Sequence, residues 1–231
     1  MGVRLNDITC FLPFNNSVTE DLTGNTTWQV VNNIGYGPLC SIVSASPSSG
    51  RKILYLKNMG PKSTPIYMIS TSNKYIFGTN DFTISFWFRK VTNDIEQSFF
   101  FIPTSDIGLY WTNTANGLCV STTTTGLIKY PDNGSLGFEW HHVAVIRIET
   151  TLYLYLDGVN VGTYNIGSTS FTGDTIRIGQ WILPSGKETT NGCDFFMSEF
   201  IIDNGHAWYT EDFTPVSFLD NKLLNNLSLS E

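Results

Sequence analysis

The side chains in this sequence whose types and spacing suit ligand binding are aromatic rings and an amide on predicted β-strands. Aromatic faces stack on sugar rings, while Asn, Asp and backbone groups hydrogen-bond to sugar hydroxyls. The candidate carbohydrate-binding residues are Trp87, Trp111, Tyr153, Tyr155, Asn160, Tyr164 and Trp181. Aromatic residues are also enriched in sheet packing and at protein interfaces, so those two interpretations stay open beside the sugar site.

Carboxylates offer a second chemistry, the hydrolysis of glycosidic bonds. Retaining glycosidases of this kind place two carboxylates on one face of a strand, about 5 Å apart. The nearest pair here, Asp194 and Glu199, is five residues apart and is predicted to face opposite sides of a regular strand. A hydrolytic triad needs a positioned histidine. We interpret His141 and His142 as packing and hydrogen-bonding groups, so the sequence predicts a protein that is not an enzyme.

Calcium is the one cofactor that the sequence leaves open, and no other is expected. Calcium prefers about six to eight oxygen ligands. The candidate ligands are Glu20, Asp21, Asp157, Asp194 and Glu199. Solvated loop acids are the default interpretation. The four cysteines lack the C-x-x-C spacing of a zinc site and are predicted to be buried thiols.

Composition narrows the class of protein. Only 14% of the 231 residues are charged and 41% are hydrophobic, which suits many short strands joined by polar turns. The net charge is −7 and no run of Lys or Arg occurs, so nucleic acid is not an expected partner. No apolar run approaches about 18 residues and no secretory signal is recognisable, so we expect no membrane span and synthesis in a cytoplasm.

The stretch from Trp140 to Tyr164 predicts three consecutive antiparallel strands. Asp157-Gly158 is a strong hairpin signal, because a type I′ turn needs positive φ at both central residues. This turn sets a register in which Leu156 opposes Val159. One face of the hairpin is then apolar and belongs in a core, with Leu152, Leu154, Leu156, Val159 and Val161. The other face carries polar and aromatic residues, namely Tyr153, Tyr155, Asn160 and Tyr164.

Strand patterns recur along the rest of the chain. Residues 82–91 alternate strongly, with Trp87 and Arg89 on the outer side, and residues 195–202 are nearly continuously apolar and predict a buried strand. Further strands are predicted at 8–14, 28–31, 53–56, 66–70, 98–102, 107–112, 118–122, 127–130 and 175–182. The Gly, Pro and Ser-rich stretch before residue 53 predicts a loop. Short strands without a long helical pattern indicate an all-β sandwich or barrel.

Several motifs in a fixed order carry a resemblance to a known family. They are NDFTISFWFRK (Asn80 to Lys90), EWHHVAVIR (Glu139 to Arg147), LYLYLDGVNVG (Leu152 to Gly162) and TIRIGQW (Thr175 to Trp181). This order resembles the laminin-G-like, pentraxin-like domains of the concanavalin A-like lectin/glucanase superfamily, over about residues 8 to 216. The resemblance implies a jelly-roll β-sandwich of two antiparallel sheets in residues 1–218. A C-terminal tail that could form a short helix is expected at 219–231.

The last motif refines the resemblance. IIDNGHAWYTEDFTP (Ile201 to Pro215) is similar to the C-terminal signature of laminin-G-like domains in phage and other viral structural proteins, although Trp208 stands where Arg is common. The resemblance implies a virion-associated structural or decoration protein whose partners are capsid or tail proteins. The alternative is a receptor-attachment module that binds a host surface glycan, and a glucanase-like hydrolase is less favoured. Self-association into a homo-oligomer stays open.

Overall fold

The computed structural model describes residues 8–32, 40–44, 51–58, 66–93, 96–112, 117–121, 126–132, 136–180 and 193–217. These residues form fifteen strands and a short 3-10 helix, η2 (Asn73–Tyr75). The predicted tail at 219–231 and Trp181 lie outside them. No helix in this part of the chain is long and apolar enough to cross a membrane.

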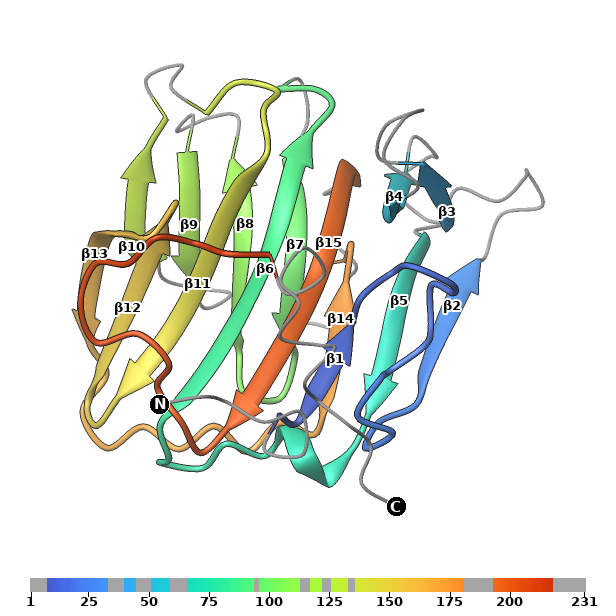
Figure 1. Cartoon of the computed structure of the whole chain (residues 1–231). Coiled ribbons are helices and arrows are strands. Elements are labelled where there is room, and N and C mark those ends of the chain that lie inside the picture. The colour runs from blue at the N-terminus through green and yellow to red at the C-terminus, as the bar shows by residue number, and fades with distance from the viewer. Residues whose placement is uncertain are drawn as a thin grey trace.

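The strands form two antiparallel sheets, which lie one in front of the other in Figure 1. Sheet A has the order β13 (Val159–Asn165), β12 (Thr151–Leu156), β11 (His141–Ile148), β6 (Phe82–Lys90), β15 (Cys193–Asn204), β4 (Lys52–Asn58) and β3 (Cys40–Ser44), and β1 (Cys10–Leu12) also pairs with β15. Sheet B has the order β10 (Gly126–Pro131), β9 (Gly117–Ser121), β8 (Ile107–Thr112), β7 (Gln97–Ile102), β14 (Thr175–Ile178), β5 (Ile66–Thr71) and β2 (Trp28–Asn32). The predicted jelly-roll sandwich is therefore confirmed.

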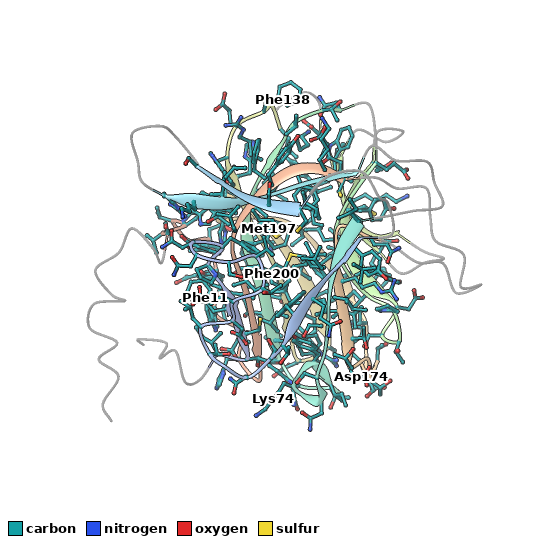
Figure 2. The ribbon with its side chains drawn as sticks, turned by 90° about the vertical axis from the view of Figure 1, so that its right-hand side faces the viewer. Phe11, Lys74, Phe138, Asp174, Met197 and Phe200 are labelled. Atoms are coloured by element: carbon teal, nitrogen blue, oxygen red, sulfur yellow. The ribbon has the colours of Figure 1, made fainter. Side chains whose placement is uncertain are left out.

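A phenylalanine-rich core fills the space between the sheets. The predicted alternation of β6 is confirmed, since Phe82, Phe86 and Phe88 are buried in this core while Trp87 faces outward and is half-buried. In the side view of Figure 2, Phe200 of β15 lies near the centre of the molecule. Successive side chains of a strand point to opposite faces of the sheet, so alternate residues enter this core and the others reach the surface.

Two bulges reset that alternation and overturn two predictions of face. Between Leu154 and Tyr155 the pairing of β12 with β13 slips by one residue, so that Tyr164 opposes Leu152. Tyr164 therefore lies on the core side of the sheet plane, at its edge, and not on the face of Tyr153. The prediction that these two tyrosines share a face is wrong.

The second bulge lies in β15. Ser198 opposes Trp87 and Ile201 opposes Ser85, so β15 contains one more residue than β6 over this interval. Glu199, within the bulge, has a φ of 53°. Asp194 and Glu199 consequently lie on the same outer face of sheet A, and the prediction of opposite faces is wrong. A bulge depends on pairing with another strand, which local patterning does not reveal.

Two smaller differences concern cysteines and one strand. Cys10, Cys119 and Cys193 are buried free thiols, as predicted, and Cys40 is a half-buried free thiol. Burial raises the pKa of Cys10 to about 12, which makes that thiol unreactive at neutral pH. Cys40 belongs to β3, which the sequence predicted as loop because this edge strand depends on its pairing with β4.

One ion pair is buried in the core at the end of β6. Lys90 Nζ lies 3.1 Å from Asp132 Oδ2 and 4.3 Å from the centre of the Trp111 ring. Burial lowers the pKa of Lys90, and the contact with Asp132 opposes that shift. Removing one partner of a buried pair leaves the other charge in a low-dielectric surrounding, which costs more than the pair itself contributes.

We therefore expect Lys90→Met to lower the free energy of unfolding by about 3–5 kcal/mol. The matched control is Lys129→Met, which removes the same charge from an exposed position on β10 and is expected to change stability by less than about 0.5 kcal/mol. Urea denaturation of the two variants measures the difference. Equal losses would show that the buried pair does not stabilise the fold.

Candidate functional site

The outer face of sheet A, turned away from sheet B, is partly covered by the segment from Gly205 to Ser217, which we call the C-terminal strap. In Figure 1 this red segment leaves β15, passes in front of β11 and β12, and turns back toward β15. The Phe213 N–H donates to the Gly158 carbonyl oxygen (2.8 Å), and the Asn160 N–H donates to Asp212 Oδ1 (2.9 Å). At its far end Ser217 hydrogen-bonds to Glu199. The strap is thus tied both to the β12–β13 hairpin and to β15.

The strap carries its own aromatic side chains onto the predicted sugar-binding face. The rings of Tyr209 and Phe213 stack with centroids 3.5 Å apart, and Phe213 also packs on Tyr155 (5.6 Å) and His142 (5.7 Å). Tyr155 is only 1% exposed, and Tyr153 stacks beside it while remaining half-buried. Because the chain itself covers Tyr155, this part of the face is not open to a sugar.

The strap also explains the unusual Trp208. Its backbone N–H donates to Thr83 Oγ1 (3.0 Å), and its indole N–H donates to Asp203 Oδ2 (2.6 Å). The uncharged indole thus hydrogen-bonds to the Asp203 carboxylate at the position where the sequence resemblance led us to expect an arginine. The strap therefore holds its position without a salt bridge from residue 208.

The other predicted sugar contacts are scattered. Trp111 is 1% exposed in the core, so it presents no face to a ligand, and Tyr164 is 39% exposed at the edge strand β13. Asn160 is exposed but next to the strap, and Trp87 is half-buried on the outer face of β6. The structure therefore brings together only Tyr153, Tyr155 and Asn160 of the predicted set. Trp87 lies on β6, on another part of the outer face.

The acids named as calcium candidates are also apart. Asp21 accepts hydrogen bonds from the backbone N–H groups of Phe11, Thr23 and Thr26, so it organises the loop before β2, and Glu20 is its half-buried neighbour. Such a carboxylate already has its acceptor positions occupied.

The remaining acids are engaged by other side chains. Asp157 Oδ2 lies 2.7 Å from His141 Nδ1, and its other oxygen accepts from the His142 N–H. Glu199 pairs with Arg51 at 2.6 Å. In the described ranges no three His, Cys, Asp or Glu side chains converge to hold a metal ion. Bound calcium stays an untested prediction of the sequence.

A different group of side chains does come together on the outer face of sheet A. Tyr55 of β4 and Arg89 of β6 stand directly opposite Phe196 of the intervening strand β15. The rings of Tyr55 and Phe196 stack with centroids 4.6 Å apart, and the Arg89 guanidinium carbon lies 4.9 Å from the centre of the Phe196 ring. All three are half-buried. We call them the aromatic–arginine row.

Polar side chains flank the row. Tyr55 donates its hydroxyl hydrogen bond to Asp194 Oδ1 (3.0 Å), and Lys57 stands opposite Asp194. Burial, with the neighbouring carboxylate, raises the pKa of Tyr55 to about 12, so the phenol remains a neutral donor. On the other side Trp87 stands opposite Ser198. Rings with donors and acceptors at their rim are the groups that bind a sugar.

Sequence reasoning missed most of this row although a signal was present. Residues 195–202 read as continuously apolar, whereas Asp194, Phe196 and Ser198 alternate outward on β15. Tyr55 and Lys57 alternate in the same way on β4. Only the pairing of the strands shows that these two short alternations meet Arg89.

Comparison with known proteins bears on this fold. The family model described as the concanavalin A-like lectin/glucanases superfamily matches residues 67–200. The chain belongs to this superfamily. A search of curated protein sequences finds no match. The sequence resemblance to the superfamily is thereby confirmed, although its viral type is not shown.

Solved structures of the same fold include binding domains of botulinum neurotoxins. The binding domain of botulinum neurotoxin serotype D/C VPI 5993 matches with a TM-score of 0.63 and 17% identity, over 97% of this chain and 53% of that one. The serotype D binding domain matches with a TM-score of 0.63 and 15% identity, over 91% of this chain and 50% of that one. This member of the superfamily thus spans about half the length of those chains, and the likeness shows the fold alone.

The tight approach of the strap to the β12–β13 turn predicts a sharp effect at Gly158. Gly158 has a φ of 82°, and a Cβ there would lie 1.8 Å from the Phe213 carbonyl oxygen. Gly167 is the matched control, because it has a φ of 57° and a Cβ added there would meet no atom within 4 Å. Left-handed alanine costs about 1–2 kcal/mol.

We expect Gly167→Ala to lose about 1–2 kcal/mol and Gly158→Ala to lose at least about 1–3 kcal/mol more, because overpacking adds to the backbone strain. Urea denaturation measures both losses. Equal losses at the two glycines would mean that the strap does not press on the hairpin.

The histidine beneath the strap predicts a pH dependence of stability. His142 is 5% exposed, and burial lowers its pKa from 6.5 to about 4, an effect that Asp157 opposes. Between about pH 6.5 and 4, His142 binds a proton in the unfolded chain but stays neutral in the folded chain. The free energy of unfolding therefore falls as the pH falls through this window.

We expect protonation of this histidine to lower the free energy of unfolding on the order of 3 kcal/mol on acidification. Urea denaturation of wild type and of His142→Gln at pH 7 and pH 4.5 measures the difference. Asp157 and other acids contribute to both proteins, so the variant isolates His142. If the stability of His142→Gln falls between pH 7 and pH 4.5 as much as that of wild type, the assignment is refuted.

Proposed function

We propose that this chain is a glycan-binding module that binds a sugar on the aromatic–arginine row. The observation that carries the proposal is the row itself, in which Tyr55, Phe196 and Arg89 lie in contact on three adjacent strands and remain half-exposed. The two rings stack on each other and the Arg89 guanidinium lies over Phe196, so a sugar ring packs its C–H groups across the exposed edges of the row. Arg89 and Lys57, which are half-buried beside the rings, donate to its hydroxyls, whereas Asp194 and Ser198 are buried.

The scaffold favours such binding. Each side chain of the row projects from a strand in the middle part of sheet A, and cross-strand contacts hold both rings before a ligand arrives. Side chains that are already ordered lose little conformational entropy on binding, so more of the contact energy appears as affinity. Tyr155 lacks this openness because the strap covers it, and Tyr153 beside it is half-buried.

The similar structures support a binding role. They include a botulinum neurotoxin DC binding domain in complex with SialylT, another in complex with rat synaptotagmin II, and a type C neurotoxin whose cell entry depends on two ganglioside molecules. Those ligands belong to those proteins, which are about twice as long as this chain. They favour a binding module of a surface-recognition protein over a purely structural one.

The proposal is for a module without catalytic activity. Asp194 and Glu199 share the outer face, but Asp194 accepts the Tyr55 hydroxyl and Glu199 is paired with Arg51. A retaining glycosidase needs one free nucleophile and one free acid about 5 Å apart. A place in a virion, as a decoration or attachment protein, remains a prediction of the sequence resemblance alone.

A glycan array tests the proposal, run first with wild type in calcium and again in EDTA. We expect binding to at least one glycan class, and we expect Phe196→Ala to weaken it by at least about tenfold, since a buried aromatic contact is worth about 1.5–3 kcal/mol. Tyr164→Ala, at an exposed tyrosine on the far edge of the same sheet, is expected to bind like wild type.

Circular dichroism and thermal unfolding confirm that each variant is folded. Wild-type protein that binds no glycan would refute the proposal, and so would Phe196→Ala binding as tightly as wild type. Binding lost in EDTA would instead favour the calcium prediction and a site built on the loop acids.

A further inference from the structure

We propose that the sugar bound by the aromatic–arginine row is acidic, carrying a carboxylate that Arg89 and Lys57 recognise. This inference rests on the proposed function and narrows it to one class of saccharide. It follows from which charges on the outer face of sheet A are already engaged and which are not.

Arg89 differs from the other arginines of the described chain. Arg51 pairs with a carboxylate, Arg147 donates to backbone carbonyl oxygens, and Arg177 donates to an amide oxygen. Arg89 donates to no acceptor within the described residues, and its Nε, like those of Arg51 and Arg177, is buried without a hydrogen-bond partner. Its guanidinium rests over the Phe196 ring instead. The row therefore holds an ordered cation whose hydrogen-bonding groups have no acceptor among the described residues.

Guanidinium geometry indicates which anion suits this position. The planar fork of an arginine matches the two oxygens of a carboxylate, and such charge-assisted pairs are shorter and about twice as strong as neutral ones. The ring beneath Arg89 fixes the plane of that fork. A sugar that lies across the exposed edges of the row would bring a ring-attached carboxylate to this guanidinium.

The rest of the face adds positive charge. Lys57 is half-buried on the same face and makes no ion pair within 4 Å in the described part of the chain. Arg51 and Glu199 neutralise each other, which leaves Arg89 and Lys57 against Asp194. This local excess of one positive charge occurs in a chain whose net charge is −7. Charge complementarity therefore favours an anionic over a neutral ligand.

The inference is tested with ligands that differ only in the acidic group. The probes are sialyllactose, its methyl ester, lactose carrying a sulfate ester, and digalacturonic acid, each titrated into the full chain by calorimetry at 50 mM salt. We expect at least one carboxylate probe to bind about tenfold or more tighter than the matched uncharged form. Raising the salt concentration is expected to shrink that preference.

Variants then assign the preference to residues. Arg89→Gln is expected to lower the preference for the acid over its ester to about threefold or less, and Arg89→Lys to restore part of it. Lys57→Gln provides a second variant should Arg89→Gln fail to fold. Lys129→Gln removes a charge from an exposed site on sheet B and is expected to keep the wild-type preference.

The outcomes separate the two proposals. Equal binding of acid and ester would overturn this inference while leaving a glycan-binding row in place. Tighter binding of the sulfated probe than of both carboxylate probes would also overturn it, in favour of a sulfate site. No binding of any probe, together with a negative glycan array, would overturn the proposed function itself. If Arg89→Gln and Lys57→Gln both keep the wild-type preference for acid over ester, the carboxylate binds elsewhere and this inference is overturned.

Discussion

The alternation of side chains along the strands of sheet A, and the two bulges that reset it, determine the surfaces that this sheet presents. In β15 the bulge places both Ser198 and Glu199 on the outer face and returns Phe200 to the core, where it meets Trp28 and Phe86. Without the extra residue, either Phe200 would face outward or Glu199 would face the core. The left-handed backbone at Glu199 is thus tied to core packing on one side and to an ion pair on the other.

The C-terminal strap follows from the same constraint. The outer face of sheet A carries Ala144, Ile146 and Tyr155, which are apolar enough to need a cover. Tyr209 and Phe213 supply it, and backbone hydrogen bonds to the β12–β13 hairpin hold the cover in place. The strap therefore divides the face into a covered part over β11 and β12 and a part over β4, β15 and β6 that remains half-exposed. The proposed binding site lies on the second part.

Charged groups are distributed according to how well each is solvated. Lys90 and Asp132 neutralise each other inside the core, and Arg51 and Glu199 do so at the far end of the strap. His142 avoids the cost of a buried charge by remaining neutral. Against this background the arginine of the aromatic–arginine row stands out, because it is ordered by a ring and not by an acid. A guanidinium without an acceptor among the described residues can form charge-assisted hydrogen bonds with an anionic ligand.

The sequence by itself determined the sandwich. The Asp157-Gly158 turn, the alternation of residues 82–91 and the order of the superfamily motifs were readable because turn chemistry and side-chain period depend on residues a few positions apart. It also determined the outward direction of Trp87. The sequence did not predict the edge strand β3 or either bulge, because each depends on pairing with another strand. Which aromatic surface is open was decided by tertiary structure alone. The contacts of Phe213 with Gly158, and of Phe196 with Tyr55 and Arg89, join segments that no local pattern relates.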